Sequence, residues 1–143
     1  MLVAPEAGDV ELFEHLDRVE SWKATAATSE LSATQFQALV LPGGVANADQ
    51  LRTDPAAVDF VRETMARRNP VAVICHGPWI LVEADGVRGR TLTSWPSLQT
   101  DIINAGGSWA DREVCVDGNL ISSRKPADLP AFCQAMVTRF AVR

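Results

Sequence analysis

Two short apolar runs constrain the fold of this chain more than any other feature of its sequence. Residues 38–41 form the first run, which ends at a proline and two glycines, and residues 71–74 form the second, which ends at a cysteine and a histidine. Continuous apolar runs of four residues are typical of strands buried on both faces of a parallel sheet. Because a helical pattern follows each run, the sequence predicts alternating strands and helices, with both turns at the carboxyl edge of one sheet.

A long helix is predicted between the two strands. Asp54 can cap its first turn, and Pro55 suits the first helical position. Val58, Val61 and Met65 follow at helical spacing and form an apolar stripe. We therefore expect this helix to pack its stripe against the sheet.

The C-terminal half continues the α/β pattern. Residues 90–94 and 109–116 are predicted to be strands, and a tight turn leads from the second of them into a return strand at 120–122. Residues 9–30 fit no single assignment. The last helix is predicted to begin at residue 126 or 128 and to bury a stripe formed by Leu129, Phe132, Met136, Val137 and Phe140.

Size and composition bound the class of the protein. The 143 residues, of which 47% are hydrophobic, fit a single domain over residues 1–143 with one core. Because the net charge is −5 and no basic cluster is present, we expect no nucleic-acid partner. The apolar runs are only strand-sized, and the N-terminus has neither a basic region nor a long apolar segment. We therefore expect no membrane partner and no signal peptide.

Three cysteines, Cys75, Cys115 and Cys133, are present without a CxxC pair. The odd number argues against a disulfide framework, and the spacing argues against structural zinc, so we expect no metal and no cofactor. A reducing, cytoplasmic location is the simplest interpretation. Cys115 falls in the predicted hairpin and Cys133 in the last helical stripe, so both are predicted to be packing residues.

Cys75 stands where a buried strand is predicted to turn sharply into a helix. The positive end of a helix dipole and the free N–H groups of a first turn stabilise a thiolate. We therefore expect Cys75 to be a nucleophile with a pKa below that of a free thiol. The alternative is a small packing residue, because free cysteine is among the most buried residue types.

Other candidates surround this turn. The backbone N–H groups of Gly44 and His76 are the expected oxyanion donors of an acyl- or carbonyl-addition site. The His76 side chain either activates the thiol or orients substrate, or only its backbone matters. Trp79 and Trp95 are predicted to be core or pocket wall. Arg124, in a predicted loop, is a candidate for binding an anionic group.

A set of motifs recurs in order along the chain and resembles a known family. The motifs are residues 38–44 (Ala-Leu-Val-Leu-Pro-Gly-Gly), 73–78 (Val-Ile-Cys-His-Gly-Pro), 88–93, 101–106, 118–124 and 126–130. Together they resemble the PfpI type of the ThiJ/PfpI superfamily, within the class I glutamine amidotransferase-like fold, over about residues 36–141. The resemblance implies a flavodoxin-like three-layer α/β sandwich with a mostly parallel sheet and a small antiparallel hairpin. It also implies a homo-oligomer, either a dimer or a larger ring of dimers.

The resemblance assigns roles to the candidate residues. It implies that Cys75 is the nucleophile, that His76 is its catalytic neighbour, and that the backbones of Gly44 and His76 hold the oxyanion. In PfpI-type peptidases an acidic residue soon after the Gly-Gly turn reaches the histidine of a neighbouring subunit. Asp49 is the best match for that residue, which implies an active site completed by oligomerisation.

The N-terminus departs from the family pattern. Family members carry a glutamate that hydrogen-bonds the cysteine, and the matching position here is Gly8, with Glu6, Asp9 and Glu11 as the nearby thiol-tuning candidates. Met1 falls inside the family's first strand. The resemblance therefore implies that most of the first helix and the second strand are missing, through an internal deletion or a truncated gene product. The absence of the glutamate bears directly on activity, because that carboxyl normally tunes the thiol.

Three functions are compatible with these residues. The main interpretation is a cysteine-dependent hydrolase of the intracellular peptidase type, in which Cys75 attacks the carbonyl of a peptide. The first alternative is a glyoxalase or deglycase acting on methylglyoxal, a small carbonyl substrate, or on glycation adducts. The second is a catalytically impaired, redox-sensing stress protein in which Cys75 is oxidised. The two enzymatic functions need the same residues, so the sequence does not separate them.

Overall fold

The computed structural model describes residues 1–14 and 17–141 and is built around a four-stranded sheet. The strands run in the order β5 (Leu39–Leu41), β6 (Val71–Ile74), β10 (Leu120–Ser123) and β9 (Val114–Asp117). β5, β6 and β10 are parallel, and β9 pairs with β10 in antiparallel fashion. The two predicted strands before the turns and the predicted hairpin are therefore confirmed.

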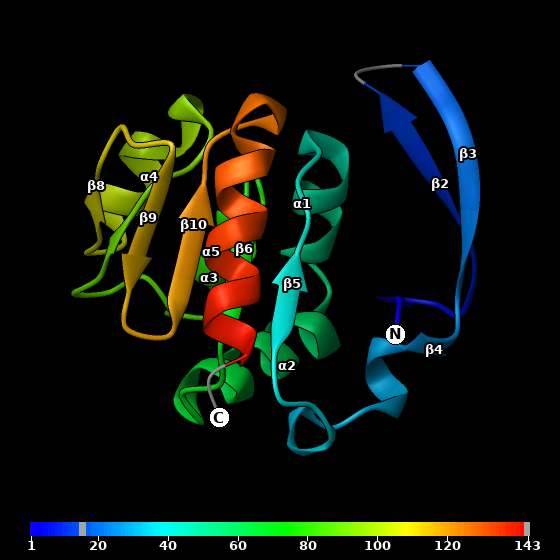
Figure 1. Ribbon diagram of the computed structural model, residues 1–143. Coiled ribbons are helices and arrows are strands. Elements are labelled where there is room, and N and C mark those ends of the chain that lie inside the picture. Colours follow the sequence, from blue (N-terminus) through cyan, green and yellow to red (C-terminus); the bar gives the residue numbers. More distant parts are fainter. Residues whose placement is uncertain (15–16, 142–143) are drawn as a thin grey trace.

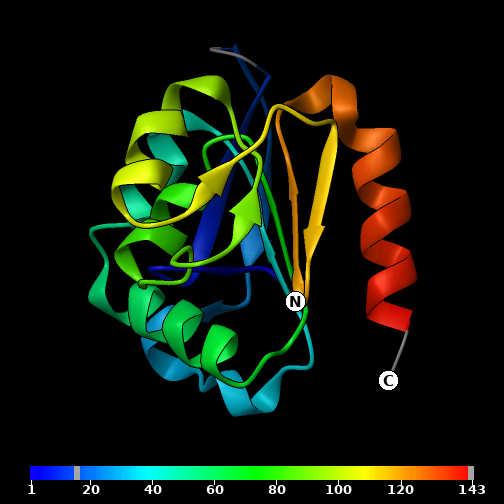
Figure 2. The same ribbon diagram turned by 90° about the vertical axis from the view of Figure 1, so that its left-hand side faces the viewer.

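Helices cover both faces of this sheet and make three layers (Figures 1 and 2). Figure 2 shows α5 alone on one side of the sheet and the remaining helices on the other. The flavodoxin-like three-layer sandwich predicted from the sequence is thus the observed fold. The helices are α1 (Val45–Leu51), α2 (Pro55–Ala66), α3 (Pro78–Glu83), α4 (Gln99–Asn104) and α5 (Leu129–Ala141).

In helix α2, both the predicted cap at the first turn and the predicted apolar stripe are observed. The Asp54 side chain accepts a hydrogen bond from the backbone N–H of Ala56, and a proline occupies the first helical position. Val58, Val61 and Met65 are all buried, as the stripe predicted. They join the larger core, which lies between the sheet and helices α1 to α4 and includes the completely buried Leu81, Leu92, Leu98, Ile102 and Leu120.

The layer on the other side of the sheet is thinner. α5 packs against β10 and β9, where its Phe132 is buried in a small cluster with residues of β6 and β10. The predicted buried stripe is only partly correct, because Leu129 is 43% exposed and Val137 is 63% exposed. A single helix does not reach across the whole sheet, so Val40 on the edge strand β5 is 46% exposed.

Short elements connect these layers. The strand predicted at 90–94 is shorter than expected and forms β7. The strand predicted at 109–116 is divided into β8, which pairs in parallel with β7, and β9, which begins later. The bounds are β7 (Thr91–Leu92), β8 (Ser108–Trp109) and the 3-10 turns η1 (Thr28–Glu30), η2 (Ala33–Gln35), η3 (Pro96–Leu98) and η4 (Pro126–Asp128).

The N-terminal region forms a projecting antiparallel hairpin, which we call the arm. It consists of β2 (Gly8–Glu14) and β3 (Asp17–Ala24), and it stands away from the sheet in Figure 1. The short strands flanking it, β1 (Val3–Ala4) and β4 (Ala26–Ala27), pair with one another in parallel and not with β5. The described residues between β1 and β4 contain no helix.

Within residues 1–14 and 17–141, no helix is long and apolar enough to cross a membrane.

Candidate active site

Cys75 lies at the turn between β6 and α3, as predicted, and its backbone is held in an unusual conformation. Its φ of 63° is in the left-handed region, which non-glycine residues rarely adopt outside constrained sites. The Cys75 N–H donates to the carbonyl of Ser123 at 3.0 Å, and the Cys75 carbonyl accepts from the Trp95 N–H at 2.9 Å. Hydrogen bonds to two separate segments therefore maintain the strained turn.

The Gly43-Gly44 turn after β5 packs directly against Cys75. A Cβ atom at Gly43 would lie 2.7 Å from the Cys75 Cβ, so only glycine fits there. Gly44 has a φ of 89°, which glycine adopts without strain. The backbones of Gly44 and His76 both act on the Cys75 thiol and oppose the rise of its pKa. Both predicted oxyanion donors therefore belong to residues beside Cys75.

The His76 side chain turns back towards Cys75. The Cys75 Sγ lies 3.2 Å from the His76 Nδ1, within hydrogen-bonding distance for a thiol. The imidazole stacks on Trp95, with ring centroids 5.8 Å apart, and meets the edge of Trp79 at 5.3 Å. The geometry thus brings a thiol, a base and two backbone donors together, which is the set that addition to a carbonyl needs.

Trp79 is itself anchored by polar partners that the sequence did not single out. Its indole N–H donates to the Asp101 carboxylate at 2.8 Å, and the Arg52 guanidinium lies 5.4 Å from its ring centroid. Arg52 is in turn paired with Glu83. These residues come from α3, from α4 and from the position that follows α1, so no local sequence motif could have revealed the arrangement.

Burial shifts the pKa of the Cys75 thiol and the pKa of the His76 imidazole in opposite directions. Burial raises the pKa of the Cys75 thiol above its ordinary value of 9.0, although the hydrogen bonds from Gly44 and His76 partly oppose this effect. Burial also lowers the pKa of His76. The expectation of a depressed thiol pKa is therefore wrong. The helix that follows the thiol, α3, has only six residues. Near neutral pH the Cys75 thiol and the His76 imidazole are both uncharged.

The acidic candidates are distributed over two regions. Asp49 is exposed on α1, and the described part of the chain offers it no hydrogen-bond or ion-pair partner. Glu6 lies in the turn before the arm, whereas Asp9 and Glu11 lie on β2, where Glu11 forms an ion pair with Arg18. None of these carboxylates contributes to the Cys75 pKa. Their proposed roles at the thiol stay predictions.

The structure also places the other residues that the sequence singled out. Arg124 binds the carboxylates of Asp128 and Asp111, which already occupy its guanidinium. Cys115 is buried, as predicted, whereas Cys133 is exposed on α5, so its assignment as a packing residue is wrong. Within residues 1–14 and 17–141, no group of three or more His, Cys, Asp or Glu side chains is placed to hold a metal ion.

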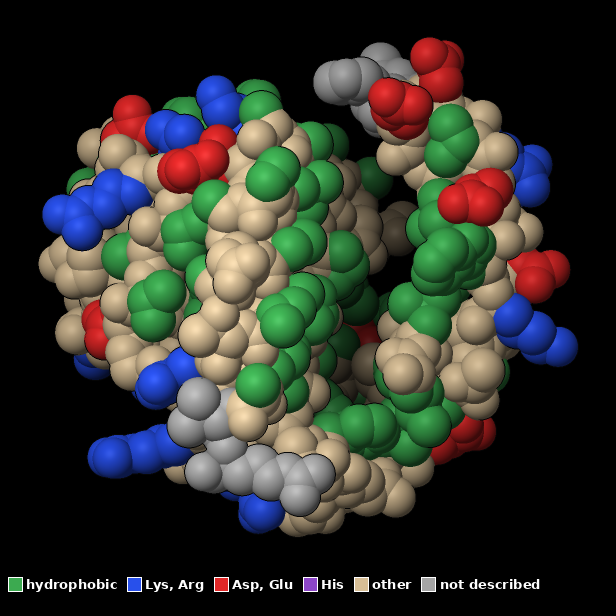
Figure 3. All heavy atoms as spheres, in the orientation of Figure 1, with side chains coloured by type: hydrophobic (Ala, Val, Ile, Leu, Met, Phe, Trp, Pro, Cys, Tyr) green, Lys and Arg blue, Asp and Glu red, His purple; other side chains and the backbone are tan. Residues whose placement is uncertain are grey.

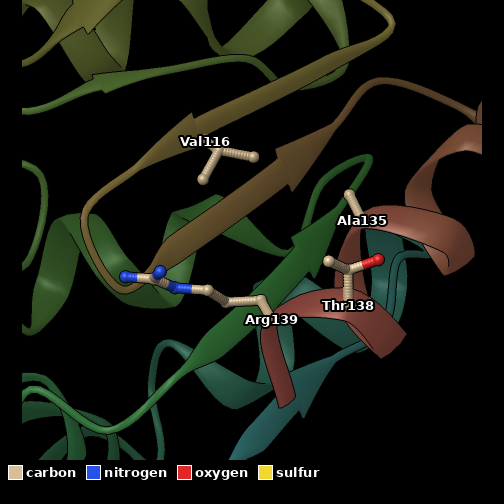
Figure 4. A pocket seen from close by; sticks show the side chains of 4 residues that line it. All are labelled: Val116, Ala135, Thr138 and Arg139. Atoms are coloured by element: carbon tan, nitrogen blue, oxygen red, sulfur yellow. The ribbon is translucent and has the colours of Figure 1, made fainter. Parts of the chain in front are cut away.

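A hollow of about 250 Å³ lies between β9 and α5. Figure 4 shows its lining side chains, which come from the edge strand β9 and from α5: Val116, Ala135, Thr138 and Arg139. It contains no nucleophile or acid–base pair, so the cysteine turn is the candidate active site.

Comparison with known proteins agrees with this architecture. "Deglycase PH1704" of Pyrococcus horikoshii is 46% identical over 117 residues, which are 82% of this chain and 70% of that protein. "Putative cysteine protease YraA" of Bacillus subtilis is 39% identical over 127 residues, covering 89% of this chain and 73% of the relative. A two-domain protein of Anabaena variabilis, with DJ-1/ThiJ/PfpI-like and ferritin-like domains, superposes with a TM-score of 0.81 at 42% identity. That match covers 83% of this chain and 35% of the other.

A family model extends the match to almost the whole chain. The model of the DJ-1/PfpI family aligns with residues 1–139, a range that includes the arm as well as the cysteine turn. This chain therefore belongs to the DJ-1/PfpI family.

Proposed function

We propose that this chain is a cysteine-dependent enzyme that acts on methylglyoxal or on the early adducts that methylglyoxal forms with amines and thiols. The observation that carries the proposal is the Cys75 Sγ at 3.2 Å from the His76 Nδ1, beside the backbone of the Gly43-Gly44 turn. The name of the Pyrococcus horikoshii relative favours this function over peptide hydrolysis.

The first chemical step follows from the protonation states. Because the thiol is neutral and the imidazole is neutral, His76 can take the Cys75 proton as the sulfur attacks an aldehyde carbon. The carbonyl oxygen then carries the negative charge, which the N–H groups of Gly44 and His76 stabilise. Return of the proton from His76 gives a neutral hemithioacetal on Cys75.

The following steps need only proton transfers and water. In the methylglyoxal hemithioacetal, His76 removes the proton from the carbon bonded to sulfur, and an enediolate forms. Protonation at the neighbouring carbon yields a lactoyl thioester of Cys75. Water then hydrolyses this thioester, releasing lactate and restoring the thiol. From an early adduct, the bond between the aldehyde-derived carbon and the amine or thiol first breaks, and the leaving amine or thiol takes the proton of the adduct's hydroxyl group. The methylglyoxal that is set free then enters the same sequence.

Peptide hydrolysis is the second candidate, favoured by the name of the Bacillus subtilis relative. It would use the same nucleophile and the same oxyanion donors, with His76 protonating the leaving amine. A role in redox sensing has less support, because oxidation to a sulfenic acid proceeds through the thiolate and burial raises the Cys75 pKa.

A paired assay tests these functions. The wild type, Cys75→Ala and His76→Ala are incubated with methylglyoxal and with methylglyoxal-treated N-acetyl-cysteine, and lactate is followed by NMR. We expect Cys75→Ala to abolish lactate formation and His76→Ala to lower it by roughly 100-fold or more. Cys133→Ala, which removes an exposed thiol far along the chain, is the matched control. Equal lactate rates for the wild type and Cys75→Ala would refute the proposal, and cleavage of fluorogenic peptides without lactate would favour the peptidase.

A further inference from the structure

Two short helices lead away from the candidate active site, and an ion pair joins their far ends. α1 begins directly after Gly44, and α3 begins two residues after His76. Because β5 and β6 are parallel neighbours, both helices start at the same edge of the sheet, and they pack against one another. Arg52 directly follows α1, and Glu83 is the last residue of α3. The pair therefore joins the two helices at the ends that point away from the site.

Arg52 contacts both an acid and an aromatic ring of α3. Its Nε donates to the Glu83 carboxylate at 3.0 Å, and its Nη2 donates to the same oxygen. Its guanidinium also lies 5.4 Å from the Trp79 ring centroid. A carboxylate and an aromatic face together hold a guanidinium in one place. Since Trp79 and Glu83 are one helical turn apart, Arg52 ties the end of α1 to a defined face of α3.

Other contacts hold α1 only weakly. Of its seven residues, only Ala48 is buried, and Val45 is 53% exposed. Figure 3 shows a hollow between the arm and the body, on the side of the body where α1 lies in Figure 1. A helix of this length is not stable in water by itself. The contacts with α3 therefore have a large share in deciding where α1 lies, and with it the backbone of Gly44.

We propose that Arg52 is a positioning residue of the candidate active site, which keeps the Gly44 backbone beside Cys75 by joining α1 to α3. No hydrogen bond links Arg52 to Cys75 or His76 within the described residues, so its action passes through the helix and the turn. An oxyanion donor is effective only at about 3 Å from the developing charge, so a small shift of Gly44 has a large effect. The expected effect on turnover rests on the proposed function, whereas the effect on the thiol does not.

Arg52→Met and Glu83→Gln test this role through the rate at which iodoacetamide alkylates Cys75 over a pH series. The Gly44 backbone lowers the Cys75 pKa, so its displacement should raise that pKa further and slow alkylation at pH 8 by about threefold. We also expect kcat for lactate formation to fall roughly tenfold while KM changes less than about twofold. The double variant should match either single variant, because the two side chains act as one unit.

The matched control is Arg62→Met, which removes the exposed ion pair with Asp59 on α2. It should leave both the alkylation rate and kcat unchanged. All variants should keep the wild-type circular dichroism spectrum, because partly exposed ion pairs contribute little to stability. Mass spectrometry of the Cys75 peptide measures alkylation separately from the other two cysteines.

The two readouts keep this proposal distinct from the proposed function. Alkylation in Arg52→Met at the wild-type rate would overturn the positioning role, as would equal slowing in Arg62→Met or additive effects in the double variant. A wild type that forms no lactate, with alkylation that still slows in Arg52→Met, would refute the proposed function and leave the positioning role in place. Lactate formation at the wild-type rate in an Arg52→Met protein would remove Arg52 from the site while the proposed function stands.

Discussion

The Sγ of Cys75 and the Nδ1 of His76 lie 3.2 Å apart even though the two residues are adjacent in the chain. Adjacent side chains on a turn usually point in different directions. Here the left-handed conformation of Cys75, the stacking of His76 on Trp95 and its edge contact with Trp79 accompany this approach. The sequence left open whether the imidazole itself takes part, and this contact supports its participation.

The raised pKa of Cys75 predicts how fast its thiol reacts with an alkylating reagent. Because burial raises the Cys75 pKa, iodoacetamide should modify Cys75 more slowly than the exposed Cys133 at pH 8, and the rate should rise steeply above pH 9. Each unit of increase in pKa lowers the thiolate fraction roughly tenfold at a fixed pH below it. Mass spectrometry of the two peptides over a pH series measures both rates. Faster labelling of Cys75 at pH 8 would show that the thiol is ionised more readily than its burial allows.

The packing of Gly43 against Cys75 predicts a strict requirement for glycine. Gly43→Ala should abolish activity and lower the free energy of unfolding by about 1–3 kcal/mol, because the new Cβ would overlap the Cys75 Cβ. Gly86→Ala is the control, since its Cβ would make ordinary contacts at 3.4 Å or more, and its effect should stay within about 1 kcal/mol. Urea unfolding and the lactate assay measure both quantities. Normal activity in Gly43→Ala would contradict the observed packing.

The hydrogen bond from Trp79 to Asp101 predicts a positioning role for Asp101. Asp101→Leu leaves the indole N–H without its partner and frees the ring that supports His76, so kcat should fall by up to roughly 100-fold while KM changes little. Asp101→Asn keeps an acceptor and should retain most activity. The His76 pKa, followed by NMR, should move in the leucine variant only. Equal behaviour of the two variants would argue that Asp101 has no influence on the site.

The exposed position of Asp49 allows a test of a shared active site. If Asp49 of one chain acts on His76 of another, Asp49→Ala and Cys75→Ala should each be inactive alone. An equal mixture of the two should then recover about a quarter of the wild-type activity or more, because some sites combine intact residues from both chains. Lactate formation after mixing and re-equilibration measures this recovery. An active Asp49→Ala protein, or no recovery in the mixture, would remove Asp49 from the mechanism.

Local patterns in the sequence were sufficient to predict strands of the central sheet and to identify the residues of the candidate site. The runs at 38–41 and 71–74 are apolar throughout, and the turns after them contain the glycines and the cysteine that such turns require. Cys75, His76 and Gly44 were therefore identified correctly as neighbours. The arm was not identified, because its short alternating segments are interrupted by charged residues and by a bulge between Leu12 and Phe13.

The order of strand and helix and the position of Cys75 at the turn after β6 were thus determined by the sequence itself, since both depend on contacts within a few residues. Three properties were decided only by the tertiary structure. The direction of the Cys75 pKa shift depends on how deeply other segments bury the thiol, and the orientation of His76 depends on Trp79 and Trp95. The exposure of Cys133 depends on α5 covering only part of the sheet, because a helix buries only the side that its neighbours reach.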